Sequence, residues 1–293
     1  LGAVHGNEVC GTLAIRRVLS DIEAGALEIR AGRVTFVPVA NPLAYAKHQR
    51  NGDRNLNRLL EPTSHPVEFE DHVANWLCPL LARHDALLDL HSFHTAGEPF
   101  VMLGPENNAG PLEAFARADE EAAFARALGV RRFIDGWLDT YAAGVARRQT
   151  LGAAHADIRY GIGTTEYLRA RGGMALTLEC GQHDDAGAPQ VAYHAIHSAL
   201  AHFGLSGAPA PAPVNGGEAL RLVEVVDRDH PGDRLARDWA SFDRLKAGDL
   251  VGVRANGAAV RAEFDGRIVF PNPAAEPGQE WFYLARESGR LGG

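Results

Sequence analysis

The hydrophobic pattern along the chain alternates between two periods. Apolar residues at helical spacing predict helices over residues 9–24, 69–81, 112–128 and 189–203. Short β-rich or apolar runs between them predict strands over residues 34–39, 86–90, 100–103 and 174–178. Strands that alternate with helices, several of them apolar on both faces, indicate an α/β fold. We therefore expect three layers, in which helices flank a mixed, mostly parallel sheet.

The pattern changes at residue 206. Residues 206–217 are rich in Pro, Ala and Gly and have no periodicity, which predicts a linker. Beyond it, short β-type runs are separated by turn residues, and Asn256-Gly257 and Asp265-Gly266 are hairpin signals. We expect an α/β domain over residues 1–205, a linker over 206–217 and a small all-β domain over 218–293. The expected strands of this second domain are 220–226, 250–254, 259–264, 267–270 and 281–284.

Composition and charge exclude several classes of protein. The net charge of −8 and the lack of a Lys/Arg cluster argue against a nucleic-acid-binding protein. The sequence contains no apolar run of 18 residues, so a membrane-spanning helix is not expected. The three cysteines are scattered and odd in number, which argues against a disulfide framework and against a thiolate zinc site.

The first residues are typical of the end of a strand. The chain begins Leu1-Gly2-Ala3-Val4 rather than with Met, and we expect the natural protein to extend further upstream. The sequence therefore leaves the question of a signal peptide open, and a cytoplasmic location is only the default expectation. A symmetric homodimer is likewise the default for the oligomeric state.

Histidine and carboxylate side chains stand where predicted strands end. His5 and Glu8 lie three residues apart between the opening strand and the first helix, and His91 ends the run 86–90. Ligands of α/β sheets gather at the carboxyl ends of strands, and a His, Glu, His set suits a catalytic zinc ion with one open position. Each residue alone also fits a structural role, Glu8 as a helix N-terminal acid and His91 as a hydrogen-bonded strand-end residue. Asp89 is a candidate to orient His91.

Two further features carry candidate chemistry. Glu179 ends the apolar run 174–178, where a carboxylate is costly to bury unless it is paired or acts as a general base. The loop from Arg50 to Arg58 holds three arginines and three asparagines within nine residues, without a hydrophobic period. Arginine suits carboxylate recognition and oxyanion stabilisation, although a solvated basic loop explains the same composition.

Taken together and in this order, these residues resemble the succinylglutamate desuccinylase/aspartoacylase family, which is related to the zinc carboxypeptidases. The resemblance is close over roughly residues 1–204 and looser beyond. Several motifs in register are far more specific than any one of them. The motifs stand here as Gly2-Ala-Val-His5-Gly-Asn-Glu8, Asn41-Pro42, Arg50 through Asn57-Arg58, Asp89-Leu-His91 and Thr177-Leu-Glu179.

The resemblance implies a zinc carboxypeptidase-like fold and a zinc site. In it, His5, Glu8 and His91 would bind one Zn²⁺ per chain. Glu179 would take a proton from the zinc-bound water and pass it to the leaving amine.

The resemblance also implies how substrate is held. Arg50 would polarise the scissile carbonyl and hold the developing oxyanion, while Asn57 and Arg58 would bind a substrate carboxylate. A further arginine before the catalytic glutamate is often used for a second carboxylate, and here Arg169 or Arg171 would take that role. Tyr283 would close the site from the C-terminal domain.

The C-terminal region looks like the barrel-sandwich shape of lipoyl-carrier domains. Lipoylation or biotinylation requires a lysine at a hairpin tip, and no lysine follows Lys246, so a carrier function is excluded. A lid or a dimer surface is the expectation instead.

The reading that unites these features is a zinc-dependent amidohydrolase that cleaves a small-molecule N-acyl amino acid. A zinc carboxypeptidase that trims a peptide C-terminus is the alternative, because the same arginines suit both substrates. A catalytically silent metal-binding protein is a third reading. The acyl group and the amine partner are not specified by the sequence.

Overall fold

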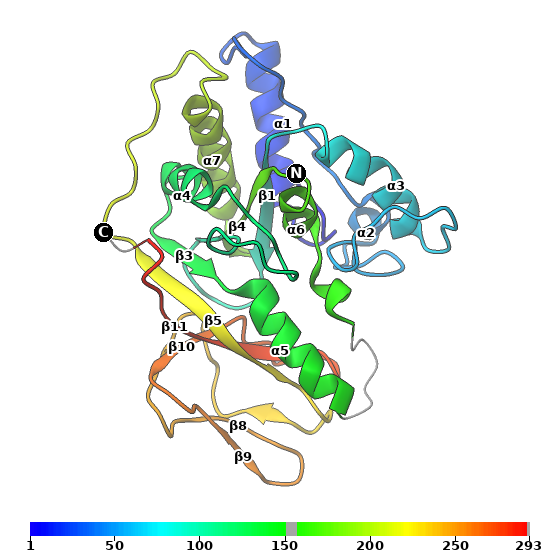
Figure 1. Ribbon diagram of the computed structural model, residues 1–293, viewed down its shortest axis with the longest axis vertical. Coiled ribbons are helices and arrows are strands. Elements are labelled where there is room, and N and C mark those ends of the chain that lie inside the picture. Colours follow the sequence, from blue (N-terminus) through cyan, green and yellow to red (C-terminus); the bar gives the residue numbers. More distant parts are fainter. Residues whose placement is uncertain (151–156, 292–293) are drawn as a thin grey trace.

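The computed structural model describes residues 1–150 and 157–291, which form a mixed sheet with helices on both faces (Figure 1). The sheet has eight strands in the order β1-β4-β2-β3-β5-β11-β10-β7. The β1–β4, β2–β3 and β3–β5 pairs are parallel, whereas β2–β4 and all pairs beyond β5 are antiparallel. The strands up to β5 are Ala86–Phe93 (β1), Phe100–Met102 (β2), Arg132–Asp135 (β3), Met174–Gln182 (β4) and Glu218–Asp227 (β5).

Helices α1 and α7 cover one face of the sheet, with α4 packed against α7, and α3, α5 and α6 lie on the other face (Figure 1). Alternate residues of β1 and β4 belong to the two apolar cores, so both faces of these strands are buried. The helices are Cys10–Glu23 (α1), Pro42–Lys47 (α2), Phe69–Leu81 (α3), Ala118–Ala127 (α4), Trp137–Thr150 (α5), Thr164–Arg169 (α6) and Ala188–His202 (α7), with a 3₁₀ turn at Ile158–Gly161.

Local sequence explains why these helices begin where they do. Helix α3 starts with a capping box, in which Glu68 and Asp71 satisfy each other's backbone N–H groups. Helix α2 starts with Asn41, whose side chain accepts a hydrogen bond from the backbone N–H of Ala44, and Pro42 follows at the first helical position. These caps fix the loops that precede the helices.

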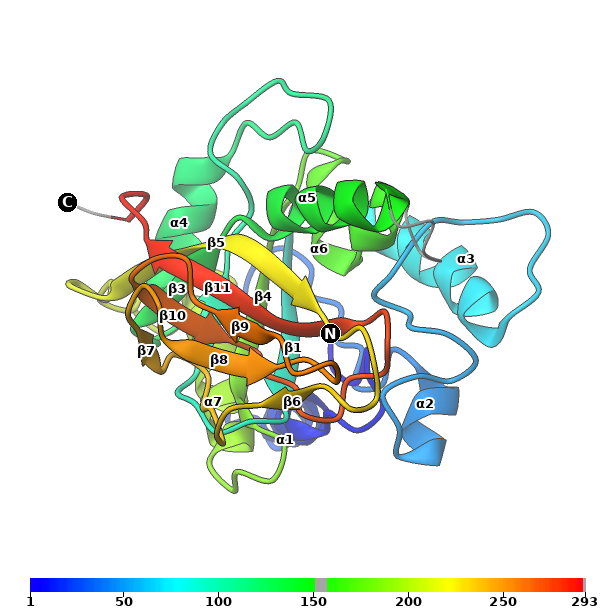
Figure 2. The same cartoon turned by 90° about the horizontal axis from the view of Figure 1, so that it is seen from below.

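The strands beyond β5 form a sandwich. The other strands are Arg234–Leu235 (β6), Arg244–Leu245 (β7), Leu250–Val253 (β8), Ala259–Arg261 (β9), Gly266–Val269 (β10) and Glu280–Glu287 (β11). Strands β6, β8 and β9 form a second sheet, which lies beside β10 and β11 (Figure 2). An apolar cluster that includes Val251, Ile268 and Trp281 fills the space between the two sheets.

The division of the chain at residues 206–217 stays a prediction. These residues contain no helix or strand, and Ser206 forms an isolated bridge with Ile29. Strand β5 follows directly and pairs with β3 on one side and β11 on the other. One sheet therefore runs through both predicted domains.

The strand predicted over residues 34–39 is wrong for the described structure. These residues are assigned to no strand, and within the described residues the backbone N–H groups of residues 34–37 donate to no backbone acceptor. Residues 1–4, predicted as the end of a strand, are likewise assigned to no strand. The other predicted helices and strands are present, although the helix predicted over residues 112–128 begins only at Ala118. The Asp265-Gly266 signal does not join β9 to β10 in a hairpin, because β10 pairs with β11 and β7. In the part of the chain that the structure describes, no helix is long and apolar enough to cross a membrane.

Candidate metal centre and active site

One turn and one strand bring the predicted ligands together. His5 and Glu8 lie in the turn before α1, and His91 lies near the end of β1. The turn passes so close to α2 that a Cβ on Gly6 would lie 2.0 Å from the carbonyl carbon of Ala44, so only glycine fits there. This close approach sets the position of the His5–Glu8 turn above the sheet.

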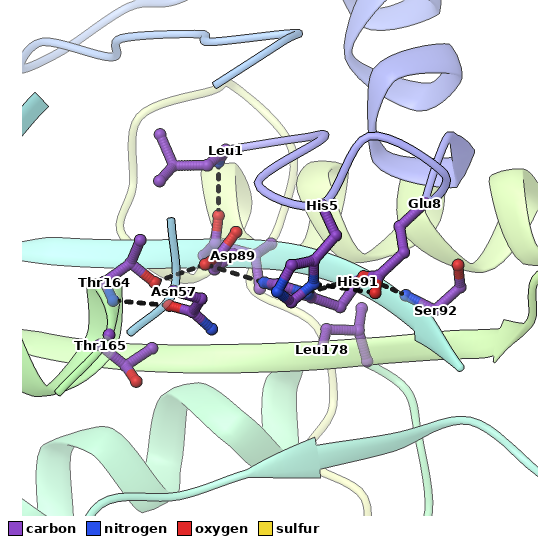
Figure 3. Close-up of polar contacts among 12 residues, drawn as sticks. Leu1, His5, Glu8, Asn57, Asp89, His91, Ser92, Thr164, Thr165 and Leu178 are labelled. Atoms are coloured by element: carbon purple, nitrogen blue, oxygen red, sulfur yellow. Dashed lines mark hydrogen bonds and ion pairs between the residues drawn. The ribbon is translucent and has the colours of Figure 1, made fainter. Parts of the chain in front are cut away.

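The three side chains converge on one point and are each only 2% exposed (Figure 3). Glu8 Oε1 lies 2.8 Å from His5 Nδ1, and Glu8 Oε2 lies 2.8 Å from His91 Nδ1. One ligand atom from each of the three residues lies within 4.8 Å of the others. We call this group the His-Glu-His cluster.

The far side of each imidazole ring is held by an oxygen atom. His5 Nε2 lies 3.0 Å from Asn55 Oδ1, and His91 Nε2 lies 3.0 Å from Asp89 Oδ2. Both oxygen atoms can accept from an Nε2–H group, and a neutral ring in that tautomer would turn its Nδ1 lone pair toward Glu8. In that tautomer, two lone pairs and a carboxylate would face one another in a buried site, which is an arrangement that could hold a metal ion.

A buried chain of hydrogen bonds connects this cluster to helix α6 (Figure 3). Thr164 Oγ1 donates to Asp89 Oδ2 at 2.5 Å, and the backbone N–H of Thr164 donates to Asn57 Oδ1 at 2.9 Å. The first residue of α6 thus holds Asp89, which faces His91, and also fixes the amide of Asn57. Because Oδ1 of Asn57 is used in this way, Nδ2 is the atom of that amide left to donate to a substrate.

Burial and the neighbouring charges shift the pKa values of all three residues of the cluster. Burial and then the Arg50 guanidinium lower the pKa of His5 to about 4. Burial opposes ionisation of Glu8, yet His5 and His91 hold the pKa of Glu8 well below its ordinary value. Burial also opposes protonation of His91, but the carboxylates of Asp89 and Glu8 raise its pKa well above the ordinary value.

Glu179 lies beside the cluster on the neighbouring strand. It is the register partner of His91 in the parallel β1–β4 pair, so the two side chains leave the same face of the sheet about 4.8 Å apart at the backbone. It is 7% exposed, and its Oε2 has no hydrogen-bond partner. Burial raises the pKa of Glu179 to about 8; His91 opposes this rise and Glu8 adds to it. A buried carboxyl with a pKa near neutrality is typical of a general base.

Arg50 reaches the cluster from the loop after α2. Its Nη1 lies 2.9 Å from Glu8 Oε1, and its side chain is 46% exposed. One side of the guanidinium therefore contacts the cluster while the rest is open to an incoming molecule.

Arg58 lies at a second group of residues, formed with aromatic side chains of α5 and β11. Its guanidinium lies 5.1 Å from the ring centroid of Trp137, and the Trp137 ring lies 5.6 Å from that of Tyr283. Tyr283 is buried and its hydroxyl has no hydrogen-bond partner. Burial, in the first place, raises the pKa of Tyr283 well above its ordinary value.

Glu280, which begins β11 three residues before Tyr283, was not singled out from the sequence. Burial raises its pKa, but Arg58, Arg148 and Arg50 together hold the pKa of Glu280 below its ordinary value. Among these arginines, Arg148 lies close to Glu280, with 3.6 Å between Arg148 Nη2 and Glu280 Oε1. Glu280 begins β11, and only its place three residues before Tyr283 could have singled it out.

Arg169 lies elsewhere. It is 4% exposed, and its guanidinium contacts three carboxylates, at 2.9 Å from Glu121, 3.0 Å from Glu113 and 3.4 Å from Glu166. It also donates to the backbone carbonyl of Ala175. These partners already neutralise the charge, so this geometry gives no support to a substrate carboxylate at Arg169. Arg171 is exposed.

Two more histidines, His94 and His183, lie near the end of β1 that carries His91. The rings of His94 and His183 lie 6.1 Å apart, and Ser92 Oγ lies 2.9 Å from His183 Nδ1. Burial, then Arg50, lowers the pKa of His94 to about 4. His94 stood out in the sequence without an expected role, and His183 was not singled out.

The first part of the chain matches a known protein family. Residues 1–126 match the model of the succinylglutamate desuccinylase/aspartoacylase catalytic domain. This segment contains His5, Glu8, the loop of Arg50 to Arg58, and His91. A search of the curated proteins found no match.

Solved structures share the fold over nearly the whole chain. A succinylglutamate desuccinylase/aspartoacylase from Rhodobacter sphaeroides matches with a TM-score of 0.72 and 18% identity, over 98% of this chain and 84% of that one. The ectoine utilization protein EutE (DoeB) from Ruegeria pomeroyi, in a product-bound structure, matches with a TM-score of 0.71 and 19% identity, over 97% and 83%. An aspartoacylase family protein from Mesorhizobium loti matches with a TM-score of 0.65 and 23% identity, over 98% and 84%.

These matches confirm the predicted fold class, a mixed sheet flanked by helices and followed by C-terminal strands. They also confirm the resemblance read from the motifs: the chain is similar to the succinylglutamate desuccinylase/aspartoacylase family, in sequence over residues 1–126 and in fold over 98% of its length.

Proposed function

We propose that the chain is a zinc-dependent amidohydrolase that cleaves an N-acyl amino acid to a carboxylate and a free amine. The observation that carries the proposal is the convergence of His5, Glu8 and His91 on one point, with Glu179 beside them on β4. The names of the relatives, desuccinylase and aspartoacylase, support the substrate class.

The proposed ligands are His5 Nδ1, the Glu8 carboxylate and His91 Nδ1, for one Zn²⁺ per chain. Nitrogen and carboxylate ligands in a set of three fit a catalytic zinc site. When bound, the ion would polarise the scissile carbonyl and lower the pKa of a water molecule to about 7. Asn55 and Asp89 would keep both rings in the tautomer that ligation requires.

Glu179 is the proposed general base. Its carboxylate would take a proton from the attacking water and later deliver it to the leaving amine, so that the amide nitrogen departs as a neutral amine. Its unpartnered Oε2 and its place beside His91 support this role.

Arg50, Asn57 and Arg58 are the proposed substrate-binding residues. Arg50 would donate to the carbonyl oxygen as negative charge develops on it, a contribution worth on the order of 10² to 10³ in rate. Asn57 Nδ2 and the Arg58 guanidinium would bind the carboxylate of the amino acid. The Tyr283 ring lies next to Trp137, which in turn lies next to the Arg58 guanidinium. The proposed role of Tyr283 is to close the site beside Arg58.

A panel of N-acetyl, N-succinyl and N-formyl amino acids tests the proposal, with release of the free amine as the readout. We expect release from at least one substrate, its loss after chelation and its return with added Zn²⁺. Release that is insensitive to the chelator would contradict the metal. Silence across the panel with release of C-terminal residues from short peptides would favour the carboxypeptidase instead. Stoichiometric zinc without turnover of either substrate class would favour a silent metal-binding protein.

A further inference from the structure

The proposed zinc ligands come from two separate segments of the chain, which must be held at a fixed distance from each other. His5 and Glu8 lie in the turn before α1, whereas His91 lies on β1. The Glu8 carboxylate lies 2.8 Å from His91 Nδ1 and accepts from the backbone N–H of Ser92 at 3.2 Å (Figure 3). Because Glu8 and His91 are themselves ligands, a separate link between the two segments would hold them in place independently of the metal.

His183 provides such a link. Its Nδ1 lies 2.9 Å from Oγ of Ser92, the residue that follows His91 on β1. Its Nε2 lies 3.4 Å from Nδ2 of Asn7, the residue that precedes Glu8 in the turn. Both ring nitrogens of His183 are therefore used, one on each of the two segments that carry the ligands.

The Asn7 amide can complete this link in either orientation. Its Nδ2 is a donor and its Oδ1 is an acceptor, and Oδ1 is buried without a hydrogen-bond partner among the described residues. With Nδ2 toward His183, the ring accepts at Nε2 and donates from Nδ1 to the Ser92 hydroxyl. With Oδ1 toward His183, the ring donates from Nε2 and accepts at Nδ1 from the same hydroxyl. A neutral imidazole thus joins the two segments in both cases.

The backbone at the end of β4 sets the place of the His183 ring. A step of two residues on β1, from His91 to Phe93, is matched by a step of three residues on β4. The extra residue is a bulge, and Gly181 within it has a φ of +139°, which residues with a side chain rarely adopt. Beyond the bulge, the backbone N–H of His183 donates to Phe93 O at 2.8 Å. The turn that carries His183 is therefore anchored to β1 by its own backbone.

We propose that His183 is a positioning residue, which ties the turn before α1 to β1 and so holds the metal ligands at the distance that a zinc ion requires. The inference rests on the proposed function, because it assumes that the His-Glu-His cluster binds zinc. Within the described residues, His183 forms no hydrogen bond or ion pair with the cluster and acts through Asn7 and Ser92. Loss of an outer-shell partner typically costs 10- to 100-fold in metal affinity, and His183 lies one step further out, so we expect a loss of about tenfold.

The test is a double-mutant cycle on Zn²⁺ affinity, measured by competition with a chromophoric chelator. It compares the unsubstituted chain with His183→Ala, Ser92→Ala and the double variant. Ser92→Ala removes the hydroxyl but keeps the backbone N–H that donates to Glu8. Because both single changes break the same link, each should lower the affinity about tenfold and the double variant should lower it no further. His94→Ala is the matched control, since it removes the ring next to His183 and should leave the affinity unchanged.

Equal affinity in His183→Ala and the unsubstituted chain would overturn the inference and leave the proposed zinc site standing. A loss of about 100-fold in the double variant would also overturn it, because the two residues would then act independently. If His183→Ala does not fold, Ser92→Ala decides alone, and an unchanged affinity in that variant would overturn the inference. Absence of zinc binding in the unsubstituted chain would overturn the proposed function as well.

The Co²⁺-loaded protein distinguishes a positioning residue from a ligand. If His183 only positions the ligands, the visible absorption bands of Co²⁺-loaded His183→Ala should lie at the same wavelengths as in the unsubstituted chain. Bands at shifted wavelengths would show that the ligand set has changed and that His183 binds the metal itself, which would overturn the positioning role.

Discussion

Thr164 provides a sharp test of the network behind the proposed zinc ligands. Its hydroxyl donates to Asp89 Oδ2, which in turn lies 3.0 Å from His91 Nε2. Thr164→Val keeps the shape of the side chain but removes this donor from a site that is fully buried. We expect Asp89 to be held less firmly and the zinc affinity to fall.

The size of this effect follows from the contacts. A hydrogen bond to a charged group contributes about 1.5–3 kcal/mol, and loss of an outer-shell partner of a metal ligand typically costs 10- to 100-fold in affinity. Thr164 acts one step further out than Asp89 and does not touch the ligand itself. We therefore predict a loss of about tenfold for Thr164→Val and a larger loss for Asp89→Ala.

The assay is competition for Zn²⁺ with a chromophoric chelator, at one pH and one protein concentration. Thr165→Val is the matched control, because Thr165 is also buried in the first turn of α6 but donates to Glu166 rather than to Asp89. Equal zinc affinity in the Thr164 and Thr165 variants would refute the reasoning, as would a loss of affinity in both. Thermal unfolding of the metal-free forms separates altered binding from altered stability.

Three other predictions follow from single contacts. Burial raises the pKa of Glu113 to about 7, although Arg169 opposes this rise. In the unfolded chain the same carboxyl loses its proton near pH 4.5, so the free energy of unfolding should fall as pH rises from 4.5 to 7. Glu113→Gln should flatten Tm against pH in this window, and an unchanged slope would contradict the assignment. Gly6→Ala should cost about 2 kcal/mol or more in a denaturant titration, because the new methyl group meets the backbone of Ala44. Arg58→Lys should raise KM for the N-acyl amino acid about tenfold at unchanged zinc content, since lysine lacks the planar fork; an unchanged KM would remove Arg58 from the carboxylate site.

Periodicity predicted the elements whose packing is local. Helix α3 and strand β4 are read correctly because their own apolar patterns match the faces that they bury. Residues 34–39 have equally good β-type composition but form no strand. A strand needs a partner as well as a pattern, and among the residues that the structure describes the N–H groups of residues 34–37 reach no backbone acceptor. Helices α2 and α6 are six residues each, too short for a period to show.

The sequence predicts the site residues that stand at the ends of strands. It does not predict contacts between elements that are distant in the sequence. His5, Glu8 and His91 stand in motifs, and the structure brings them together. Arg169 was proposed from its spacing before Glu179, but spacing does not show that three carboxylates surround it.

Contacts across long stretches of sequence were the hardest to foresee. Glu280 has no local signal, because Arg148, whose Nη2 lies 3.6 Å from its Oε1, is more than a hundred residues away in the sequence. Thr164 likewise has no motif, and its importance follows only from the approach of α6 to β1. Both are cases in which the tertiary fold, rather than residue type, creates the site.

The measurement that tests the central claim most directly is zinc content and turnover determined together for Glu179→Gln. The account predicts one Zn²⁺ per chain, as in the unchanged protein, with kcat lower by about 10²- to 10⁴-fold, because a general base is lost and no ligand is removed. His91→Ala, measured in parallel, should lose the metal. A Glu179→Gln protein that has lost its zinc, or one that keeps zinc and full activity, would contradict the account.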